Sequence, residues 1–399
     1  MDSQVKPVFA PNSIYLDYAA TTAVDRRVLD AMYGIMAQGH TGNAHARHHV
    51  YGAAAHRSVE AARQQVAEAI GADPSEIFFT SGATEANNLA IKGIAAHLKA
   101  EGRMHLVTSA VEHASVLEPL HELEAQGFEL TVLAVKPCGM IEADMIERAI
   151  RFDTGLVCVQ AVNNEVGVIQ PIEEIAVMLK GRGILFQCDA AQALGKKNFN
   201  VSPCADDSSL GPDFVSLSSH KVYGPQGIGA LYVRAEKKHV LTAVNRGGGQ
   251  ESGLRSGTLP TALCVGFGKA CSLLEDDIRH IRSLRWAFLN RLSWLNPTVY
   301  GHSHVDWNVP GILNIRFEGI ETETLIMALP DLAFGVGAAC SSGGAKLSHV
   351  VRATTGSEQA ARESMRISFG RFTTHQEILR AADLLVEAVE EIREVQGVA

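Results

Sequence analysis

The stretch EIFFTSGATEANNLAIKGIAAHL, residues 76–98, changes its pattern once, and this change decides the fold. Its first part is a short apolar run, typical of a buried strand. From Gly82 onward the residues have helical spacing, so we predict a helix that continues to Leu98. The same alternation of strands and helices extends over about residues 58–235. The further predicted helices are 58–71, 114–127, 142–150 and 171–183, and the further strands are 104–111, 129–135, 156–162, 184–190, 213–219 and 229–234. Apolar strands separated by helices indicate a mostly parallel sheet covered on both faces, an α/β fold.

The C-terminal third has a different pattern. Its predicted helices are 261–277, 280–295 and 375–395, and its predicted strands are 311–317, 332–339 and 364–370. This order indicates a smaller α+β domain. We therefore divide the chain into an N-terminal extension (1–15), a large α/β domain (16–264) and a small domain (265–399). We expect the residues before about 30 to pack with the small domain.

Composition excludes several classes of protein. Of the 399 residues, 46% are hydrophobic and 20% charged, which is ordinary for a globular chain and argues against disorder. The net charge of −9 argues against a nucleic-acid-binding surface. No apolar run is long enough to span a bilayer, and the first residues lack a signal-peptide pattern. We expect a cytoplasmic enzyme without a direct nucleic-acid or membrane partner.

The seven cysteines are scattered, and no CxxC pair occurs. A disulfide framework is not expected in such a chain. Cys158 and Cys188 lie in predicted strands and are expected to be core residues. Cys340 differs, because GAACSSGG (337–344) has few side chains that could bury a thiol. The reason for a thiol at this position stays open at this point.

Polar and glycine residues follow the predicted strands. They occur in FFTSGATEANN (78–88), TSAVEHAS (108–115), VQAVNNEVG (159–167), FQCDAAQALG (186–195) and SLSSHKVYGPQG (216–227). Ligands of open α/β sheets bind at the carboxyl ends of the strands. These stretches are therefore the predicted site.

Lys221 is the first candidate for chemistry, since it directly follows a buried strand. A desolvated lysine is a nucleophile for carbonyls, and pyridoxal phosphate is such a carbonyl, held as a Schiff base. Asp189 could pair with the pyridinium nitrogen of that cofactor, and Gln192 could donate to its ring hydroxyl. The alternatives are a solvated surface lysine for Lys221 and a helix N-cap for Asp189.

The remaining candidates would hold a phosphate or a substrate. Gly82, Ala83 and Thr84 stand at a predicted helix N-terminus, which favours anions, and Ser218 and His220 could add donors. His113 could stack on the cofactor ring and shuttle a proton, or else be a helix-capping or core histidine. Asn164 could contact cofactor or substrate. Arg366 suits a bidentate grip on a carboxylate, with a surface ion pair as the alternative.

Several longer stretches together carry a family resemblance. They are YLDYAATT (15–22), IFFTSGATEANNLAIKG (77–93), VNNEVGVIQPI (162–172), DAAQALGK (189–196), SSHKVYGPQGIGALYVR (218–234), GGGQESGLRSGT (247–258), GAACSS (337–342) and RISFGRFTT (366–374). In these stretches the chain resembles the NifS/IscS-like cysteine desulfurases of the class-V aminotransferase family. The resemblance implies a fold-type I, pyridoxal-phosphate-dependent transferase.

The resemblance also implies roles for single residues. Lys221 would be the Schiff-base lysine, and Cys340 would be the catalytic cysteine. Asn43 and Asn164 would help Arg366 to bind the substrate. The cofactor would be bound by the residues Ala83, Thr84, His113, Asn164, Asp189, Gln192, Ser218, His220 and Lys221. Thr258 would reach the phosphate from the second subunit, which implies a homodimer.

The implied reaction removes sulfur from L-cysteine. Lys221 would take the Cα proton, Cys340 would attack the substrate sulfur and keep it as a persulfide, and L-alanine would leave. We expect His113 or the cofactor region to help deprotonate Cys340. The sulfur would pass to an acceptor protein, such as an iron–sulfur scaffold or a thiolation carrier. A flexible tether of Gly, Ser and Ala would let the thiol enter and leave the site.

Three stretches depart from the family pattern. GNAHARHHVYG (42–52) lacks the usual proline, and its histidines are weak evidence for a metal, so we expect none. The loop after Cys340 carries two glycines, and by comparison with the family pattern we expect the C-terminal tail that docks a scaffold to be missing or shortened. Two alternatives therefore stay open: another enzyme of this fold (a selenocysteine lyase, a β-lyase or an aminotransferase) and a non-catalytic scaffold.

Overall fold

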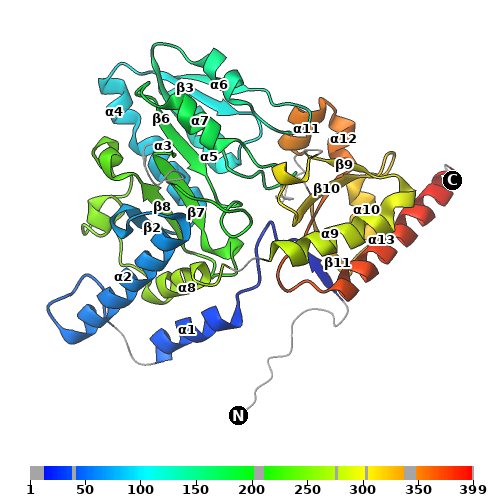
Figure 1. Ribbon diagram of the computed structural model, residues 1–399, viewed down its shortest axis with the longest axis horizontal. Helices are drawn as coiled ribbons and strands as arrows, with labels where there is room; N and C mark the ends of the chain where they lie inside the picture. The colour runs from blue at the N-terminus through cyan, green and yellow to red at the C-terminus, as the bar shows by residue number, and fades with distance from the viewer. Residues whose placement is uncertain are drawn as a thin grey trace.

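A computed structural model describes residues 13–37, 42–201, 211–274, 277–301, 304–336 and 347–397. It contains a seven-stranded and a five-stranded sheet with helices packed around each (Figure 1). The strand order in the first sheet is β2-β8-β7-β6-β5-β3-β4. Its strands are β2 (Ile77–Thr80), β3 (His105–Ser109), β4 (Glu129–Leu133), β5 (Thr154–Cys158), β6 (Leu185–Asp189), β7 (Phe214–Ser218) and β8 (Gly229–Val233). Only β8 among them runs antiparallel to its neighbours, so the predicted mostly parallel sheet is confirmed.

Helices cover both faces of this sheet because successive strand residues point to opposite sides. Phe79 packs into a core with α2, α7 and α8, whereas its neighbour Phe78 packs into a core with α3 and α5. The helices of this part are α1 (Arg26–Ala37), α2 (Val50–Ile70), α3 (Ala83–Gly93), α4 (Ala95–Ala100), α5 (Ala114–Ala125), α6 (Ala143–Ala149), α7 (Ile172–Leu179) and α8 (Thr261–Cys271).

Two predicted helices have different bounds in the structure. The helix expected to run to Leu98 breaks after Gly93, whose carbonyl accepts a hydrogen bond from Thr242 N (2.8 Å) and so leaves the helical ladder. α2 begins at Val50 rather than at residue 58, because the His49 side chain caps it by accepting from Gly52 N (3.0 Å). The first turns of α2 are rich in Ala and Gly, which hides the apolar period.

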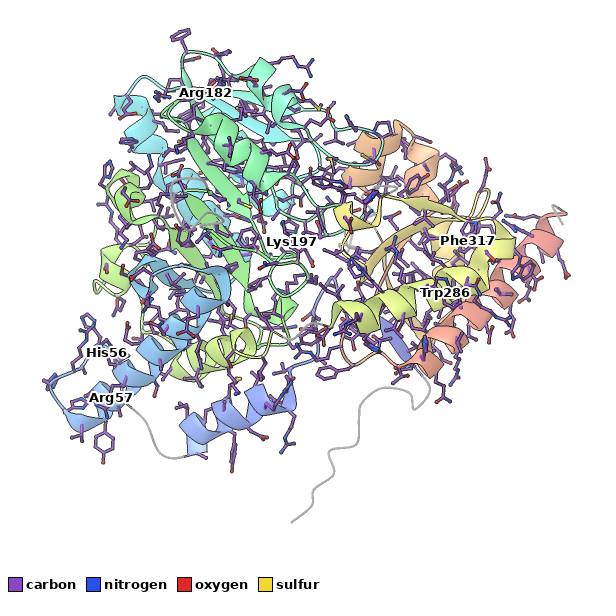
Figure 2. All side chains as sticks on the ribbon, in the orientation of Figure 1. His56, Arg57, Arg182, Lys197, Trp286 and Phe317 are labelled. Atoms are coloured by element: carbon purple, nitrogen blue, oxygen red, sulfur yellow. The ribbon has the colours of Figure 1, made fainter. Side chains whose placement is uncertain are left out.

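The second sheet has the order β1-β11-β12-β10-β9. Its strands are β1 (Ile14–Leu16), β9 (Thr298–Tyr300), β10 (Ile312–Arg316), β11 (Leu332–Val336) and β12 (Ser364–Ser368). Its helices are α9 (Ile278–Leu292), α10 (Thr322–Ala328), α11 (His349–Thr355), α12 (Glu358–Arg362) and α13 (His375–Gln396). α9 and α13 lie side by side over one face (Figure 1). Figure 2 shows Trp286 and Phe317 in this part, with His56 and Arg57 of α2 at the opposite end of the molecule.

The N-terminal strand belongs to the second sheet, although α1 packs with α8 beside the first. The boundary predicted after residue 264 falls within α8, and the buried Phe267 and Cys271 of α8 belong to the core of the first sheet. We therefore propose that the small domain begins after α8 and includes β1. Cys158 and Cys188 are buried in the first sheet, as predicted. Of the described helices, none has the length and apolarity to cross a membrane.

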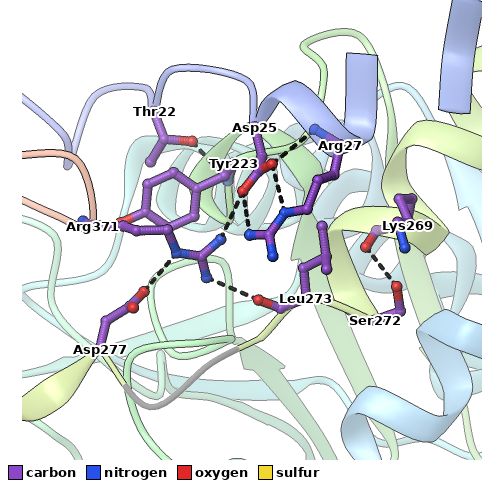
Figure 3. Close-up of polar contacts among 9 residues, drawn as sticks. All are labelled: Thr22, Asp25, Arg27, Tyr223, Lys269, Ser272, Leu273, Asp277 and Arg371. Carbon is purple, nitrogen blue, oxygen red and sulfur yellow. Dashed lines mark hydrogen bonds and ion pairs between the residues drawn. The ribbon is translucent and has the colours of Figure 1, made fainter. Parts of the chain in front are cut away.

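Arg371, which follows β12, joins the two parts of the chain near their connection (Figure 3). Its guanidinium contacts Asp277 (2.8 Å), Asp25 (3.2 Å) and the Leu273 carbonyl (2.9 Å). It also lies over the ring of Tyr223, 4.4 Å from the centroid. The backbone N–H of Arg371 donates to the Tyr223 hydroxyl (2.7 Å). Tyr223 is two residues beyond Lys221, so this cluster fixes the junction directly behind the predicted site.

Candidate active site

A cleft of about 1470 Å³ lies at the carboxyl ends of the parallel strands, between the two sheets. Ten of the predicted site residues line it: Ala83, Thr84, His113, Asn164, Asp189, Gln192, Ser218, His220, Lys221 and Arg366. Three do not. Asn43 lines a separate cavity of about 710 Å³, Thr258 lies on an exposed segment, and Cys340 lies outside the described residues.

Lys221 lies in a single turn of helix after β7, where its chain is partly buried. Its Nζ donates to the carbonyls of Ala19 and Ala20, both at 2.6 Å. Burial, together with the positive charge of Arg366, lowers the pKa of Lys221 to about 8. The surface alternative is therefore wrong, and the amine is partly neutral near physiological pH, as a nucleophile or base needs to be.

A second lysine, Lys196, stands behind Lys221. Its Nζ donates to Gln192 Oε1 (2.8 Å) and approaches the Lys221 carbonyl (3.4 Å). Burial and the charge of Lys221 lower the pKa of Lys196 to about 7. Lys196 binds the amide oxygen of Gln192. The amide nitrogen of Gln192 is therefore turned to act as a donor, and it donates to the Ala19 carbonyl (2.8 Å). This orientation agrees with a donor role for Gln192.

Asp189 ends β6 and precedes a series of turns rather than a helix, so it is not a helix N-cap. Its Oδ1 accepts from Ala191 N (3.0 Å), and its Oδ2 accepts from Asn87 Nδ2 (2.8 Å). The carboxylate is buried and lines the cleft. A buried carboxylate of this kind favours a cationic ring nitrogen as partner.

His113 is a helix-capping residue, one of the alternatives that the sequence left open, and its place in the cleft is compatible with the predicted contact to the cofactor. It caps α5, with Nδ1 accepting from Ser115 N (3.1 Å), and it also lines the cleft. Burial is the first cause that lowers the pKa of His113, and the nearby Lys221 acts in the same direction. Both effects favour the neutral form of the ring.

The predicted phosphate cradle lies at the start of α3. No side chain caps this helix, so the first N–H groups after Gly82 are free for an anion. Glu85 lies in the same turn, where Arg255 Nε contacts its carboxylate at 2.8 Å. Burial would raise the pKa of Glu85, but the hydrogen bonds from Arg255 and Ser81 outweigh it and lower the pKa to about 2. Arg255 thus compensates a negative charge beside the cradle.

His220 lies at the same end of the cleft. Burial and the charges of Lys221 and Lys196 lower the pKa of His220 to about 4. Its Nδ1 lies 3.1 Å from Thr21 Oγ1. A neutral imidazole can donate a hydrogen bond to a phosphate oxygen without adding charge.

Arg366 extends from β12 into the cleft, so its ion pair is internal rather than on the surface. Its Nη2 contacts Asp17 Oδ1 (2.7 Å), and its Nη1 donates to the Asn164 carbonyl (3.1 Å). Its Nε is buried without a hydrogen-bond partner among the described residues. A guanidinium held in this way presents donors to a carboxylate in the cleft.

The wall on the side of the second sheet was not predicted. It includes Val336, Leu347, His349 and Arg352. His349 Nε2 contacts the Glu112 carbonyl (2.9 Å). No sequence signal marked these residues, because they join the site through long-range packing, in which Val350 of α11 packs in one cluster with Val111, Val166 and Val168 beyond the strands of the first sheet. Asp17, Asn87 and Lys196, in contrast, lie within stretches already singled out by sequence.

The described residues contain no group of three or more His, Cys, Asp or Glu side chains that could hold a metal ion. His48 and His49 contact each other edge to face, with centroids 4.7 Å apart. The Nδ1 atom of His49 is already used in capping α2.

Comparison with known proteins places this cleft in a family. Residues 14–380 match the family described as Aminotransferase class-V. Over 390 residues the chain is 45% identical to the cysteine desulfurase IscS of Colwellia psychrerythraea, covering 96% of this chain and 94% of that protein. A solved NifS-like protein has a TM-score of 0.84 at 31% identity, covering 95% of this chain and 99% of that one. A structure described as SspA in complex with cysteine has a TM-score of 0.79 at 37% identity, covering 90% and 99%.

These matches extend over nearly the whole chain and include both sheets. The predicted fold-type I architecture and the predicted cofactor, pyridoxal phosphate, are thereby confirmed. The chain belongs to the class-V aminotransferase family of pyridoxal-phosphate-dependent enzymes, and within it to the IscS/NifS-like cysteine desulfurases.

Proposed function

We propose that the protein removes sulfur from L-cysteine, releases L-alanine and holds the sulfur as a persulfide on Cys340. The observation that carries this proposal is the cleft itself. It brings Lys221, Asp189, His113 and Arg366 together from strands far apart in the sequence. It is also lined by Val336 and Leu347, which flank the segment that contains Cys340. Cys340 is four residues from Val336, a span of at most about 14 Å.

The residues present fit pyridoxal phosphate. The uncapped start of α3 offers N–H groups to the phosphate, Asp189 a carboxylate to the ring nitrogen, and Lys221 an amine to the aldehyde carbon. When bound there, the cofactor supplies an electron sink for charge that develops on the substrate Cα. Gln192, with its amide oriented by Lys196, would donate to the ring hydroxyl.

The residues of the chain would divide the remaining work. Arg366 would bind the substrate carboxylate, while Asp17 and the Asn164 carbonyl keep its guanidinium in place. Lys221 would accept the Cα proton, since burial keeps its amine partly neutral at physiological pH. The Cys340 thiolate would attack the sulfur of the substrate, so that a sulfur–sulfur bond forms as the carbon–sulfur bond breaks.

The sulfur acceptor would be a protein of iron–sulfur cluster assembly or thiolation, which the name of the IscS relative supports. The chain would act as a homodimer in the cytoplasm. In that dimer Thr258 would complete the phosphate site of the partner, which agrees with its exposed position outside the cleft of its own chain.

The test is peptide mass spectrometry after the holoenzyme is mixed with L-cysteine and no reductant. We expect one added sulfur atom on the Cys340 peptide and an equal amount of L-alanine. Cys340→Ala should lose both, whereas Cys138→Ala, at a partly buried cysteine, should keep them. A Cys340→Ala variant that still consumes cysteine would instead indicate a β-lyase or another enzyme of this fold. A protein that binds the cofactor but turns over no amino acid would be a scaffold.

A further inference from the structure

A chain of hydrogen bonds, buried except at its His113 end, connects Asp189 with His113. It runs through Asn87 of α3 and Ser115 of α5, both of them buried. Asn87 Nδ2 donates to Asp189 Oδ2 and to Ser115 Oγ, each at 2.8 Å. Ser115 Oγ lies 2.8 Å from His113 Nδ1. Both lie in stretches that the sequence marked, Asn87 in residues 78–88 and Ser115 in residues 108–115, but neither was given a role, and the reaction outlined above does not use them.

The donor and acceptor roles along this chain have one consistent direction. Asp189 Oδ2 accepts from Asn87 Nδ2, so Asn87 turns its nitrogen toward Asp189 and its oxygen away. Gln187 confirms this orientation, because its Nε2 donates to Asn87 Oδ1 (2.7 Å). Asn87 gives its second hydrogen to Ser115 Oγ. The hydroxyl hydrogen of Ser115 is then left for His113.

The direction of these bonds determines the tautomer of His113. Its Nδ1 lies within reach of two donors, the Ser115 hydroxyl (2.8 Å) and the Ser115 backbone N–H (3.1 Å). A nitrogen that accepts two hydrogen bonds carries no hydrogen of its own. The hydrogen of the neutral ring is therefore on Nε2. This is the nitrogen that Ser115 does not bind, so it is available to a ligand in the cleft that His113 lines.

We propose that Asn87 and Ser115 are positioning residues that hold His113 as an Nε2–H hydrogen-bond donor toward the cofactor and substrate. This proposal rests on the proposed function, because it assigns the resting state of a residue of that site. It differs from the expectation that His113 or the cofactor region helps to deprotonate Cys340. A ring nitrogen that already carries a hydrogen cannot accept another, so Nε2 would first have to lose its hydrogen.

The groups that face His113 agree with a neutral donor. Lys221 and His349 oppose a positive charge on the ring, whereas Asp189 and Glu165 favour one. Burial has the largest effect and also opposes a positive charge, so the pKa of His113 is lowered. Protonation at Nδ1 would, in addition, place a hydrogen against both donors of Ser115.

The test is nitrogen-15 NMR of the histidine-labelled holoenzyme, with the His113 signals assigned from a His113→Gln variant. We expect a hydrogen on Nε2 and none on Nδ1. Ser115→Ala should shift the ring toward the Nδ1–H form, because the hydroxyl donor is gone and the Ser115 N–H bond is the weaker of the two. Ser115→Thr, which keeps a hydroxyl, should restore the original signals. Ser283→Ala, whose hydroxyl bonds to the His280 carbonyl within α9, is the matched control.

The kcat/KM value should change in the same variants in which the NMR signals of His113 change. Losing one net hydrogen bond in this chain is expected to lower kcat/KM about five- to tenfold in Ser115→Ala and in Asn87→Leu, with the pH profile displaced. An Nδ1–H ring in the unaltered protein, or a tautomer unchanged in both variants, would overturn the proposal. Because the NMR signals do not depend on turnover, a holoenzyme that fails to release alanine would refute the proposed function without deciding the tautomer.

Discussion

Gly335 of β11 lies directly against the guanidinium of Arg366, its partner across the β11–β12 pair. A Cβ on Gly335 would lie 2.7 Å from Arg366 Nε and 2.8 Å from Nη2. Such contacts are closer than non-bonded atoms allow, so only glycine leaves the guanidinium where it is. Glycine is required here for the space that it leaves and not for its backbone freedom.

Gly335→Ala should therefore displace Arg366 and weaken the binding of L-cysteine. A charge-assisted hydrogen bond contributes about 1.5–3 kcal/mol, so we expect KM to rise about tenfold or more, with a smaller change in kcat. Steady-state kinetics would measure this, with Ala333→Ser on the same strand as control. An unchanged KM in a folded Gly335→Ala protein would show that Arg366 does not hold the substrate carboxylate.

The pKa of Lys221 predicts how the cofactor-free protein takes up pyridoxal phosphate. Only the neutral amine attacks a carbonyl. Because burial lowers the pKa to about 8, the rate should rise with pH up to about 8 and then level off. Stopped-flow absorbance at different pH values would follow the reaction, with Lys221→Ala as the blank. A rate that keeps rising to pH 10 would mean an ordinary, solvated lysine.

Glu112 predicts a dependence of stability on pH. Complete burial raises the pKa of its carboxyl group to about 8, and Ser109 Oγ donates to Oε1 at 2.7 Å. The unfolded state loses this proton near pH 4.5, whereas the folded state keeps it to about pH 8. Between these values the folded state binds more protons, so its stability falls as pH rises.

Glu112→Gln keeps the shape and removes the titration. Between pH 6 and pH 8 its free energy of unfolding should fall by about 2 kcal/mol less than that of the unaltered protein. Urea titrations at the two pH values would measure the difference. Glu118→Gln, at the mouth of the cleft, is the control. Equal pH dependence in Glu112→Gln and the unaltered protein would contradict a protonated Glu112.

Arg371 should contribute strongly to stability because its guanidinium is largely buried between Asp25, which is buried, and Asp277, which is partly buried. Arg371→Met leaves Asp25 and Asp277 without this guanidinium and is expected to cost about 3 kcal/mol. Arg148→Met, which breaks an exposed pair with Asp144 on α6, should cost no more than about 0.5 kcal/mol. Chemical denaturation of both variants would compare them. Similar losses would mean that the cluster in Figure 3 is no stronger than a surface ion pair.

The strands of the first sheet, and the polar residues that follow them in the site, could be predicted because both depend on the local sequence pattern. Asp189 is the last residue of one apolar strand, and Lys221 lies in the turn after another. The carboxyl ends of parallel strands meet at one edge of the sheet, which brings such residues together. The break after Gly93 could not be predicted, because it depends on a hydrogen bond from Thr242, far along the chain. The same holds for Ser115 and His349, whose roles come from long-range packing. Asn43 was expected in the site but lines another cavity, since the segment before α2 leads away from the cleft.

Thr258 gives a prediction that separates a dimeric site from a site within one chain. If Thr258 completes the cleft of the partner subunit, Thr258→Ala alone should weaken the binding of pyridoxal phosphate about tenfold, through the loss of a hydrogen bond to a charged group. A Lys221→Ala chain alone should be inactive. Mixed dimers of the two variants contain one cleft with Lys221 from one chain and Thr258 from the other.

That mixed cleft should regain the full affinity for the cofactor and turn over L-cysteine at about half the rate of the unaltered dimer. Mixed dimers can be isolated with two different affinity tags, and alanine release at a limiting cofactor concentration would measure the affinity. Arg255→Lys is a useful third variant, since Arg255 holds the segment before Thr258 to Glu85 beside the cradle. If mixing restores nothing, Thr258 acts within its own chain or not at all, and the exposed position of Thr258 has another cause.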